Sequence, residues 1–427
     1  MGVNVAFKTL GCKLNQYETD SLASQFSDGG YEITEFNGKA DVYVINSCTV
    51  TNQSDQKSRN IINQAKRHNP EGIFVITGCM ADNAGSALED PTTRTLLIKN
   101  KQKSSVFSQV DSLIKGESLP AITNDVFGFK PIRNGFHTRA TIKVQDGCDN
   151  YCTFCIIPFV RGRAISRPSK DIINEVQQVI DFGYKEIVIT GVNISRYKDN
   201  ETKFDDLVEK ILEIKGDFRL RISSIEPDNI TDRFIELFNH PKMTPHLHLC
   251  LQSGSEKVLL QMRRMYSVST FTNIIGKVKK QFPDFNFTTD VIVGFPGETD
   301  SDFEETCKVV KEVGFTHVHT FPFSERTGTR AERMSDKVSS ALKKHRSEII
   351  RAISEENQLS YYKGFIGKQQ KVLTESRAKR KYLQGYGENY IPILINQTNN
   401  IEANKFYNVK IEELQNENKP LLIGTIV

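Results

Sequence analysis

The 427-residue sequence lacks several features that would assign a protein to a class at once. It contains no apolar stretch approaching the ~20 residues that a membrane-spanning helix needs. Its first residues show no basic segment followed by an apolar one, so we expect no signal peptide and no membrane partner. The strand-like stretch and Gly/Pro turn at residues 291–298 lack the lysine of a Walker phosphate-binding loop. The lack of a membrane-length apolar stretch and of a signal peptide predicts a cytoplasmic protein.

Cysteine is also scarce, which bears on the role of the thiols. Eight cysteines in a chain of this length are too few for a disulfide scaffold. Without a secretion signal, they are expected to be reduced thiols that serve as metal ligands. The composition, 38% hydrophobic and 25% charged, is that of a soluble globular protein. The net charge of +4 permits a nucleic-acid partner without requiring one.

Three of the cysteines form a C-x3-C-x2-C run at Cys148, Cys152 and Cys155. The run follows a strand-like stretch at residues 141–144. Three thiolates this close can hold three irons of a cubane iron–sulfur cluster, which leaves the fourth iron open to a substrate. A closed zinc site and buried structural cysteines are the alternatives. Zinc sites usually show paired C-x2-C or Cys/His spacing, which this run lacks.

Residues 1–130 alternate between strand-like and helical patterns, which predicts an open parallel α/β sheet with a helix at residues 52–67. Three strand-like stretches run directly into Cys12, Cys48 and Cys79. In an open parallel sheet, the loops beyond the carboxyl ends of the strands lie on one edge, where ligands bind. These cysteines, 36 and 31 residues apart, can therefore meet and hold a second cluster with one open iron. Chance placement of structural cysteines is the alternative.

Residues 131–363 repeat this alternation, with strand-like stretches that end near residues 147, 193, 227, 254, 297 and 324. Helical patterns lie between them, for example at residues 170–182 and 205–215. Six strands with crossover helices predict a partial (β/α)6 barrel, parallel and open on one side. Another helix is expected to begin near Asp300, capped by Thr299 or by Asp300 itself.

Four histidines in this segment come in alternating pairs, His246 with His248 and His317 with His319. No cysteine or carboxylate stands beside either pair at metal-ligand spacing, so we expect these histidines to be structural. Cys250 and Cys307, within a strand and a helix, are likewise expected in the core.

Residues 364–427 lose the helical period and show short alternating stretches, which predicts a small antiparallel β barrel. A basic cluster lies beside three tyrosines in this segment. The cluster comprises Arg377, Lys379, Arg380 and Lys381, and the tyrosines are Tyr382, Tyr386 and Tyr390. Basic residues interleaved with aromatic ones suit single-stranded RNA, and a solvated hairpin tip is the other interpretation.

The two cysteine sets together resemble those of the radical S-adenosylmethionine (SAM) methylthiotransferases, and the resemblance covers essentially the whole chain. The matching stretches are KTLGCKLNQ (residues 8–16), NSCTV (46–50), TGC (77–79), LCLQSGS (249–255), MRRMY (262–266) and DVIVGFPGE (290–298). The resemblance implies a cluster domain at residues 1–130, a radical SAM domain at 131–363 and an RNA-binding TRAM domain at 364–427. Residues 13–15 resemble the branch that modifies N6-threonylcarbamoyladenosine at position 37 of tRNA. Sister branches act on N6-isopentenyladenosine in tRNA or on a ribosomal-protein aspartate.

The resemblance also implies two 4Fe–4S clusters, and SAM as both radical source and methyl donor. The cluster on the C-x3-C-x2-C run would cleave SAM reductively. The cluster on the other three cysteines would carry the sulfur that is methylated and then transferred to carbon 2 of the adenine ring. The implied partners are the anticodon region of tRNA, an electron donor such as flavodoxin or ferredoxin, and a sulfur source.

Contacts with SAM are expected from strand ends and from the aromatic residue before the last cysteine of the run. The candidates are Phe154, Gly191, Asn193, Glu226, Gln252 and Ser253, for which strand-end capping is the alternative. Two rivals stay open: a non-catalytic iron–sulfur RNA-binding protein, and a radical SAM enzyme that acts on protein. Both cysteine triplets lack a local fourth ligand, which favours an enzyme, and the basic and aromatic C-terminal segment favours RNA.

Overall fold

A computed structural model describes residues 2–427 except 89–91, 134, 380–381, 397–400 and 417–419. The chain forms two compact units. The first comprises Met1–Phe182, Thr190–Val192 and Ser324–Glu332, and the second comprises Gly183–Ile189, Asn193–Phe323 and Arg333–Val427. Residues 131–182 thus pack in the first unit and residues 364–427 in the second, and the three-domain division stays a prediction.

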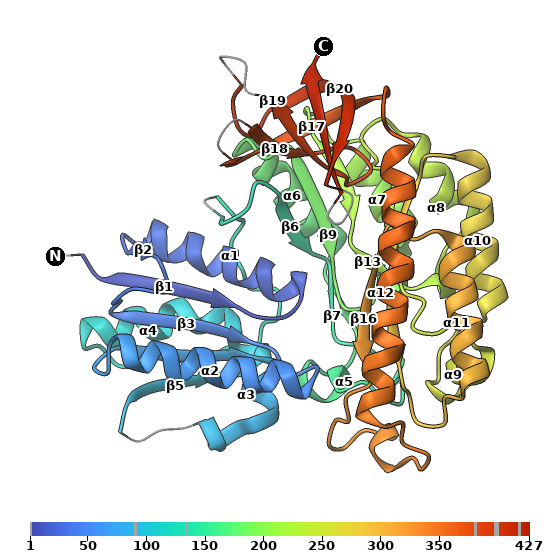
Figure 1. Ribbon diagram of the computed structural model, residues 1–427. Coiled ribbons are helices and arrows are strands. Elements are labelled where there is room, and N and C mark those ends of the chain that lie inside the picture. Colours follow the sequence, from blue (N-terminus) through green and yellow to red (C-terminus); the bar gives the residue numbers. More distant parts are fainter. Residues whose placement is uncertain (1, 89–91, 134, 380–381, 397–400, 417–419) are drawn as a thin grey trace. The chain divides into compact units, whose positions relative to one another are not determined.

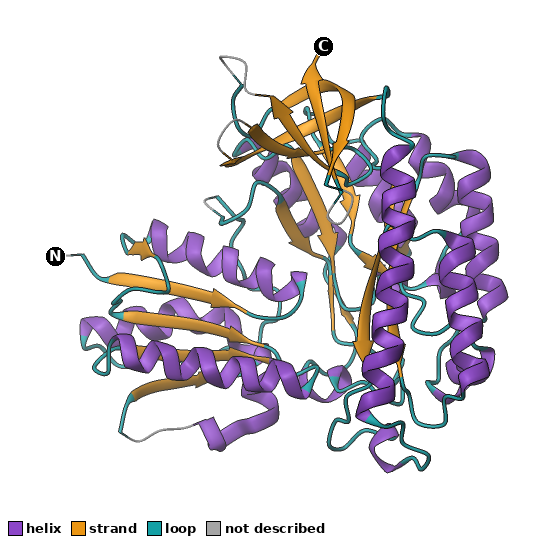
Figure 2. Ribbon diagram, in the orientation of Figure 1, coloured by secondary structure: helices purple, strands orange, loops and turns teal. Residues whose placement is uncertain are grey.

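A five-stranded parallel sheet in the order β2-β1-β3-β4-β5 forms the N-terminal part of the first unit (Figures 1 and 2). Its strands are β1 (Asn4–Thr9), β2 (Glu32–Thr34), β3 (Val42–Ser47), β4 (Ile73–Gly78) and β5 (Arg94–Ile98). β3 and β4 are buried along their whole length, as expected of central strands with both faces covered. The predicted open parallel α/β sheet is confirmed.

Helices cover both faces of this sheet. On one face, Phe26 of α1 (Lys13–Asp28) packs edge-on against Phe7 of β1 and Phe107 of α4 (Val106–Lys115), with ring centroids 5.6 and 5.1 Å apart. On the other face, Ile62 and Ala65 of α2 (Asn52–His68) join the buried apolar cluster of the strands. The remaining elements of the unit are α3 (Cys79–Ala84), β6 (Ala140–Lys143), β7 (Gln145–Asp146), α5 (Ile157–Val160), β8 (Ile165–Ser166) and α6 (Ser169–Asp181). Short 3-10 turns lie at Gly85–Leu88 and Asn100–Ser105.

The second unit contains parallel strands with crossover helices, as predicted for a partial barrel. Its parallel pairs are β9 with β12, and β13-β14-β15-β16 in that order. These strands are β9 (Glu186–Thr190), β12 (Arg219–Ile222), β13 (Ser224–Ile225), β14 (His246–Leu249), β15 (Asn286–Val293) and β16 (His317–Pro322). The helices are α7 (Phe204–Leu212), α8 (Asp232–Glu236), α9 (Glu256–Gln261), α10 (Val268–Gln281), α11 (Asp300–Val313) and α12 (Ser340–Lys363). A two-stranded ribbon joins β10 (Lys198–Asp199) to β11 (Thr202–Lys203).

The predicted start of α11 is confirmed. Thr299 is its N-cap, and a capping box joins the Thr299 side chain to the backbone of Asp302 and the Asp302 carboxylate to the backbone of Thr299. None of the helices in the described part of the chain combines the length and apolar character that crossing a membrane requires.

The C-terminal strands close into a five-stranded barrel in the order β17-β18-β19-β21-β20. They are β17 (Gln369–Lys379), β18 (Tyr382–Tyr386), β19 (Pro392–Asn396), β20 (Phe406–Gln415) and β21 (Leu421–Ile426). Four neighbouring pairs are antiparallel, but β19 and β21 are parallel. The predicted small β barrel is confirmed, with one parallel pair among antiparallel ones, because an odd number of strands cannot alternate in direction around a closed ring.

Two buried arginines of β12 attach this barrel to the parallel strands of the second unit. Both pair with Glu186 at the start of β9, at 2.6 Å for Arg219 and 2.7 Å for Arg221. Arg219 also donates to the carbonyl of Tyr386 at 3.0 Å, and the Arg221 guanidinium lies 4.4 Å from the ring centroid of Tyr390. The barrel therefore lies at the amino ends of these strands, away from the carboxyl ends where ligands of parallel sheets bind.

Candidate active site

Three cysteines lie at one edge of the N-terminal sheet. Cys12 is the N-cap residue of α1 after β1, Cys48 directly follows β3, and Cys79 directly follows β4. Because β1, β3 and β4 are neighbours in a parallel sheet, their carboxyl ends lie side by side (Figure 1). The predicted placement of three cysteines after adjacent strands is confirmed.

The local backbone brings two of these cysteine loops into close contact. Gly11 has a φ of +96°, and a Cβ atom there would lie 2.9 Å from Cβ and 3.0 Å from Sγ of Cys48. Only glycine permits this approach without a shift of the neighbouring side chain. Cys12 is exposed, whereas Cys48 and Cys79 are buried.

The thiols of this triplet are close enough to influence one another. Burial raises the pKa of the Cys79 thiol to about 11. The charge of Arg161 opposes this rise, and the thiols of Cys12 and Cys48 add to it. Burial also raises the pKa of Cys48. Thiols of this kind lose their protons when a metal binds. Three converging thiols, one of them open to solvent, fit a cluster that keeps one iron free of protein ligands.

The second triplet lies in the loop that follows β7. The three cysteines are half-buried, and the Cys155 amide donates to the Cys152 carbonyl at 3.0 Å, which tightens the loop. Gly147 precedes the loop with a φ of +67°, and a Cβ atom there would lie 2.0 Å from the carbonyl oxygen of Arg163. Any other residue at this position would displace the loop. The three closely spaced thiols fit the predicted 4Fe–4S cluster.

Both triplets belong to the first unit, and two sets of contacts join their surroundings. Cys79 packs in one apolar cluster with Ile156 and Val160, which directly follow the second triplet. The segment Ser324–Glu332 contacts both cysteine loops. Arg326 donates to the Thr49 hydroxyl at 2.8 Å beside Cys48, and the Ala331 amide donates to the carbonyl of Thr153 at 2.9 Å. No periodicity or residue spacing in the sequence indicates this role for residues 324–332.

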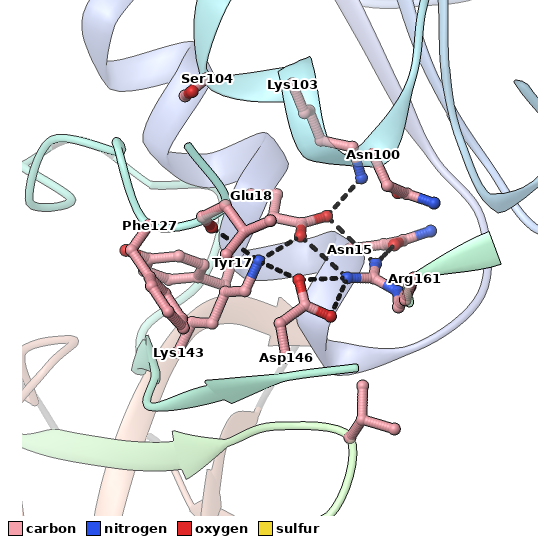
Figure 3. A network of polar contacts seen from close by, with 12 residues as sticks. Asn15, Tyr17, Glu18, Asn100, Lys103, Ser104, Phe127, Lys143, Asp146 and Arg161 are labelled. Carbon is pink, nitrogen blue, oxygen red and sulfur yellow. Dashed lines mark hydrogen bonds and ion pairs between the residues drawn. The ribbon is translucent and has the colours of Figure 1, made fainter. Parts of the chain in front are cut away.

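Five charged side chains of the first unit form a buried network (Figure 3). Two of its cations, Arg161 and Lys103, act on the Cys79 thiol. Glu18 of α1 pairs with Lys103, with Lys143 at 2.9 Å and with Arg161 at 3.1 Å. Asp146 pairs with Lys143 at 2.6 Å and with Arg161 at 3.0 Å. All five side chains are at most 4% exposed, so the network holds three cations and two carboxylates away from water.

The network has one more cation than carboxylates, and its positive charge affects the pKa values of the Glu18 carboxyl and the Cys79 thiol. Burial would raise the pKa of the Glu18 carboxyl, but Arg161, Lys103 and Lys143 hold it well below its usual value. Arg161 and Lys103 also favour the thiolate form of Cys79. Positive charge beside a site for three thiolates and a cluster compensates the negative charge that assembles there. Sequence analysis missed this network because its members are 85 to 143 residues from Glu18.

The predicted SAM contacts belong to both units. Phe154 and Gly191 lie in the first unit, and the other four lie in the second. Asn193 accepts a hydrogen bond from the Ser195 hydroxyl at 2.8 Å, and Glu226 pairs with Arg264. The structure therefore assigns protein partners to these two side chains, and their contact with SAM stays a prediction.

Gln252 and Ser253 follow β14 and differ in their surroundings. Gln252 has a φ of +64°, an unusual conformation for a residue other than glycine, and both of its backbone groups bond to β15. Such strain is found at functional sites, which favours the prediction for Gln252. Ser253 is fully buried, and its hydroxyl accepts a hydrogen bond from the Ser255 amide at 3.2 Å, an arrangement typical of local capping.

The histidine pairs have a carboxylate neighbour that sequence spacing did not reveal. Asp290 of β15 lies between them, with its Oδ1 atom 3.2 Å from Nε2 of His248. Burial would raise the pKa of Asp290, but the His248 hydrogen bond and the charges of His248 and His319 lower it. Sequence spacing did not reveal this carboxylate, because the parallel register places residues 42 positions apart beside one another.

The C-terminal basic cluster lies largely outside the described residues. Arg380 and Lys381 are not described, nor are the side chains of Arg377 and Lys379. Tyr390 packs on Arg221 and lies 5.1 Å from the His246 ring, and Tyr386 stacks on Tyr390 at 5.0 Å. These two tyrosines therefore help to attach the barrel to the parallel strands.

Comparison with known proteins defines the class first. A model described as "Uncharacterized protein family UPF0004" matches residues 4–98, and a model described as "Radical SAM superfamily" matches residues 142–310. The fold is similar to that of the radical SAM methyltransferase TsrM from Kitasatospora setae, solved with cobalamin and a 4Fe–4S cluster. That match has a TM-score of 0.52 at 13% identity and covers 75% of each chain, which supports the fold alone. Sequence match, cysteine site and fold together define a radical SAM protein.

Full-length relatives identify the family. The threonylcarbamoyladenosine tRNA methylthiotransferase MtaB of Bacillus subtilis (strain 168) is 38% identical, over 95% of this chain and 93% of the relative. Its namesake in Thermotoga maritima is 36% identical, over 97% and 95%. The tRNA-2-methylthio-N(6)-dimethylallyladenosine synthase of Endomicrobium trichonymphae is 33% identical, over 87% and 89%. The chain therefore belongs to the tRNA methylthiotransferase family, whose cofactors are SAM and 4Fe–4S clusters.

Proposed function

We propose that this protein methylthiolates carbon 2 of N6-threonylcarbamoyladenosine at position 37 of tRNA. The observation that carries the proposal is the pair of three-cysteine sites in one compact unit of a chain whose full-length relatives are tRNA methylthiotransferases. The carbon 2 hydrogen of an adenine ring is not acidic, so side-chain bases cannot remove it at neutral pH and a cofactor must carry the chemistry.

In this proposal, the bound clusters and SAM supply reductive SAM cleavage and the methylthio group. The protein's own residues hold these groups and exclude water. Cys148, Cys152 and Cys155 would hold the SAM-cleaving cluster, and the cysteines after β1, β3 and β4 would hold the sulfur-carrying one. Gln252, with its strained backbone, is the SAM contact that we favour most among the candidates of the second unit.

RNA recognition would use a surface in each of the two units. The C-terminal barrel lies at the amino ends of the parallel strands of its unit, which suits a role in tRNA affinity rather than in chemistry. Beside the second triplet, Tyr151 and Phe159 are 36% and 61% exposed, with ring centroids 6.4 Å apart. Exposed aromatic rings are stacking platforms for unpaired bases. We further propose a cytoplasmic enzyme that receives electrons from a flavodoxin or ferredoxin and sulfur from a separate source.

Nucleoside mass spectrometry of tRNA from a deletion strain tests the function. Loss of 2-methylthio-N6-threonylcarbamoyladenosine, with accumulation of the unmodified precursor, is expected. The parent gene should restore the modification, and a Cys152→Ala gene should not. Loss of 2-methylthio-N6-isopentenyladenosine instead would assign the protein to the sister branch, and unchanged tRNA would refute both.

A salt titration of tRNA binding tests the role of residues 364–427. Replacing Arg377, Lys379, Arg380 and Lys381 with Ala should weaken binding and reduce the slope of log K against log salt by about 3, if each contacts a phosphate. A matched control removes four exposed lysines elsewhere, at Lys277, Lys280, Lys308 and Lys311. Equal effects of the two variants would show that net charge, and not this segment, determines affinity.

A further inference from the structure

We propose that His248, Asp290 and His319 form a divalent metal site on the inner face of the parallel strands, separate from the six cluster cysteines. The three residues belong to the adjacent strands β14, β15 and β16. One ligand atom from each lies within 4.8 Å of the other two. Two imidazole nitrogens and one carboxylate oxygen are a donor set that borderline first-row cations such as Zn²⁺ and Fe²⁺ prefer.

The register of the strands creates this juxtaposition. His248 pairs with Thr288, Thr288 pairs with His317, and Asp290 pairs with His319. Residues two apart on a strand share a face, so these side chains project from one face of three neighbouring strands. Val318, which lies between the two histidines on β16, is buried and points to the other face, whereas His317 and His319 are exposed; α12 contacts β16 through the Ser354 hydroxyl, which accepts from the Val318 amide at 2.9 Å. The histidine face is therefore the one that the helix leaves uncovered.

The separation of donor atoms suits coordination. Nε2 of His248 lies 3.2 Å from Oδ1 of Asp290. Two ligands bound at about 2.1 Å, with an angle near 100° at the metal, are about 3.2 Å apart. The carboxylate and this ring nitrogen are thus already spaced for a shared cation.

The other ring nitrogen of each histidine is held by a neighbour. Nδ1 of His248 lies 3.0 Å from the Thr288 hydroxyl, and Nδ1 of His319 lies 3.2 Å from Nε2 of His317. Metal-binding histidines are usually oriented by a contact on the nitrogen opposite the metal, as Thr288 contacts Nδ1 of His248 opposite the Nε2 atom that faces Asp290.

The site is also accessible. The His248 side chain is 10% exposed, that of Asp290 is 27% exposed, and His319 is an exposed residue. A cation can enter from the His319 side. Three protein donors leave at least one coordination position for water or for an oxygen of a bound ligand.

Zinc binding to the reconstituted holoenzyme tests the proposal, because the iron–sulfur clusters then occupy the six cluster cysteines. The protein is dialysed anaerobically against micromolar ZnCl₂, and bound zinc and iron are counted separately. One zinc ion per chain is expected for the parent. His345→Ala, which removes an exposed histidine of α12, is the matched control and should bind the same amount. His248→Ala and Asp290→Asn should bind zinc at least tenfold more weakly, with iron content and thermal melting unchanged.

Two further measurements keep the proposal falsifiable if one variant folds poorly. Thr288→Val should weaken zinc binding by about 10- to 100-fold, because it releases the His248 ring. X-ray absorption at the zinc edge should show nitrogen and oxygen neighbours at about 2.0–2.1 Å, whereas thiolate ligands would appear at about 2.3 Å. Absence of stoichiometric zinc, sulfur neighbours, or unchanged binding in Asp290→Asn would overturn the assignment.

Discussion

Glu18→Gln is expected to be the most destabilising conservative change in the first unit. Glu18 is 1% exposed and contacts all three cations of the buried network (Figure 3). The parent network has three cations and two carboxylates, so its net charge is +1. The variant keeps three cations with one carboxylate, which raises the net charge to +2. The side-chain oxygen of the glutamine still accepts one hydrogen bond, but the side-chain NH2 group would face a cation.

The expected loss of stability follows from the desolvation of the charges left behind. Removing one partner of a buried ion pair typically costs about 3–5 kcal/mol. Lys103 retains only a neutral acceptor among the contacts described, the Asn46 side-chain oxygen at 3.1 Å. Lys143 and Arg161 keep their ion pairs with Asp146. The loss of stability should therefore be close to that of one broken ion pair rather than three. Since a domain is stable by about 5–15 kcal/mol, the first unit should become marginal.

Urea unfolding of the metal-free protein measures this loss. The chain has no tryptophan, so far-ultraviolet circular dichroism and hydrogen exchange of α1 are the suitable probes. The double variant Glu18→Gln with Lys103→Met keeps two cations and one carboxylate, which restores the net charge of +1. It should regain most of the lost stability. If the double variant is as unstable as the single one, or if the single one matches the parent, the electrostatic reasoning is wrong.

The remaining predictions concern single sites of the first unit. Lys103→Met removes a positive charge that acts on Cys79. The reduction potential of the N-terminal cluster should therefore fall by tens of millivolts in an EPR-monitored titration. Lys143→Met, the control, should lower that potential by less. Ala in place of the three N-terminal cluster cysteines should remove about half the iron yet keep SAM cleavage; unchanged iron content would contradict the second cluster. Burial raises the pKa of Asp20 from 3.8 to about 7, so its stabilising effect is present below about pH 4 and lost as the pH rises to about 7. Asp20→Asn should therefore stabilise the protein at about pH 8, by up to about 4 kcal/mol, and have little effect at about pH 4; equal effects at both pH values would refute the burial argument.

Local sequence patterns predicted the strands, and the strands predicted the N-terminal cysteine site. Apolar runs that end in Cys12, Cys48 and Cys79 are visible without a structure, and the topology of a parallel sheet brings their ends together. The same reasoning predicted α11 and limited its N-cap to Thr299 or Asp300, because capping depends on residues within one helical turn. Such features are encoded within one or two neighbouring elements.

The buried network and the His248–Asp290–His319 group are encoded differently. Each joins side chains from three or more elements, and their proximity depends on strand register and helix packing. A register change of one residue would turn Asp290 to the other face of β15 and leave both histidines without it. Sequence spacing cannot specify that register, so the sequence alone indicates only a structural role for the histidines.

Buried charges also explain why the compact units differ from the sequence segments. In the first unit, Arg161 and Lys143 from residues 131–182 pair with Glu18 of the N-terminal segment. In the second, Arg219 donates to carbonyl groups of the C-terminal barrel. Buried ion pairs add little net stability compared with apolar packing, but they are costly when mispaired. Each segment therefore has one favourable docking geometry, because any other would leave an arginine or lysine buried without its carboxylate or carbonyl partner.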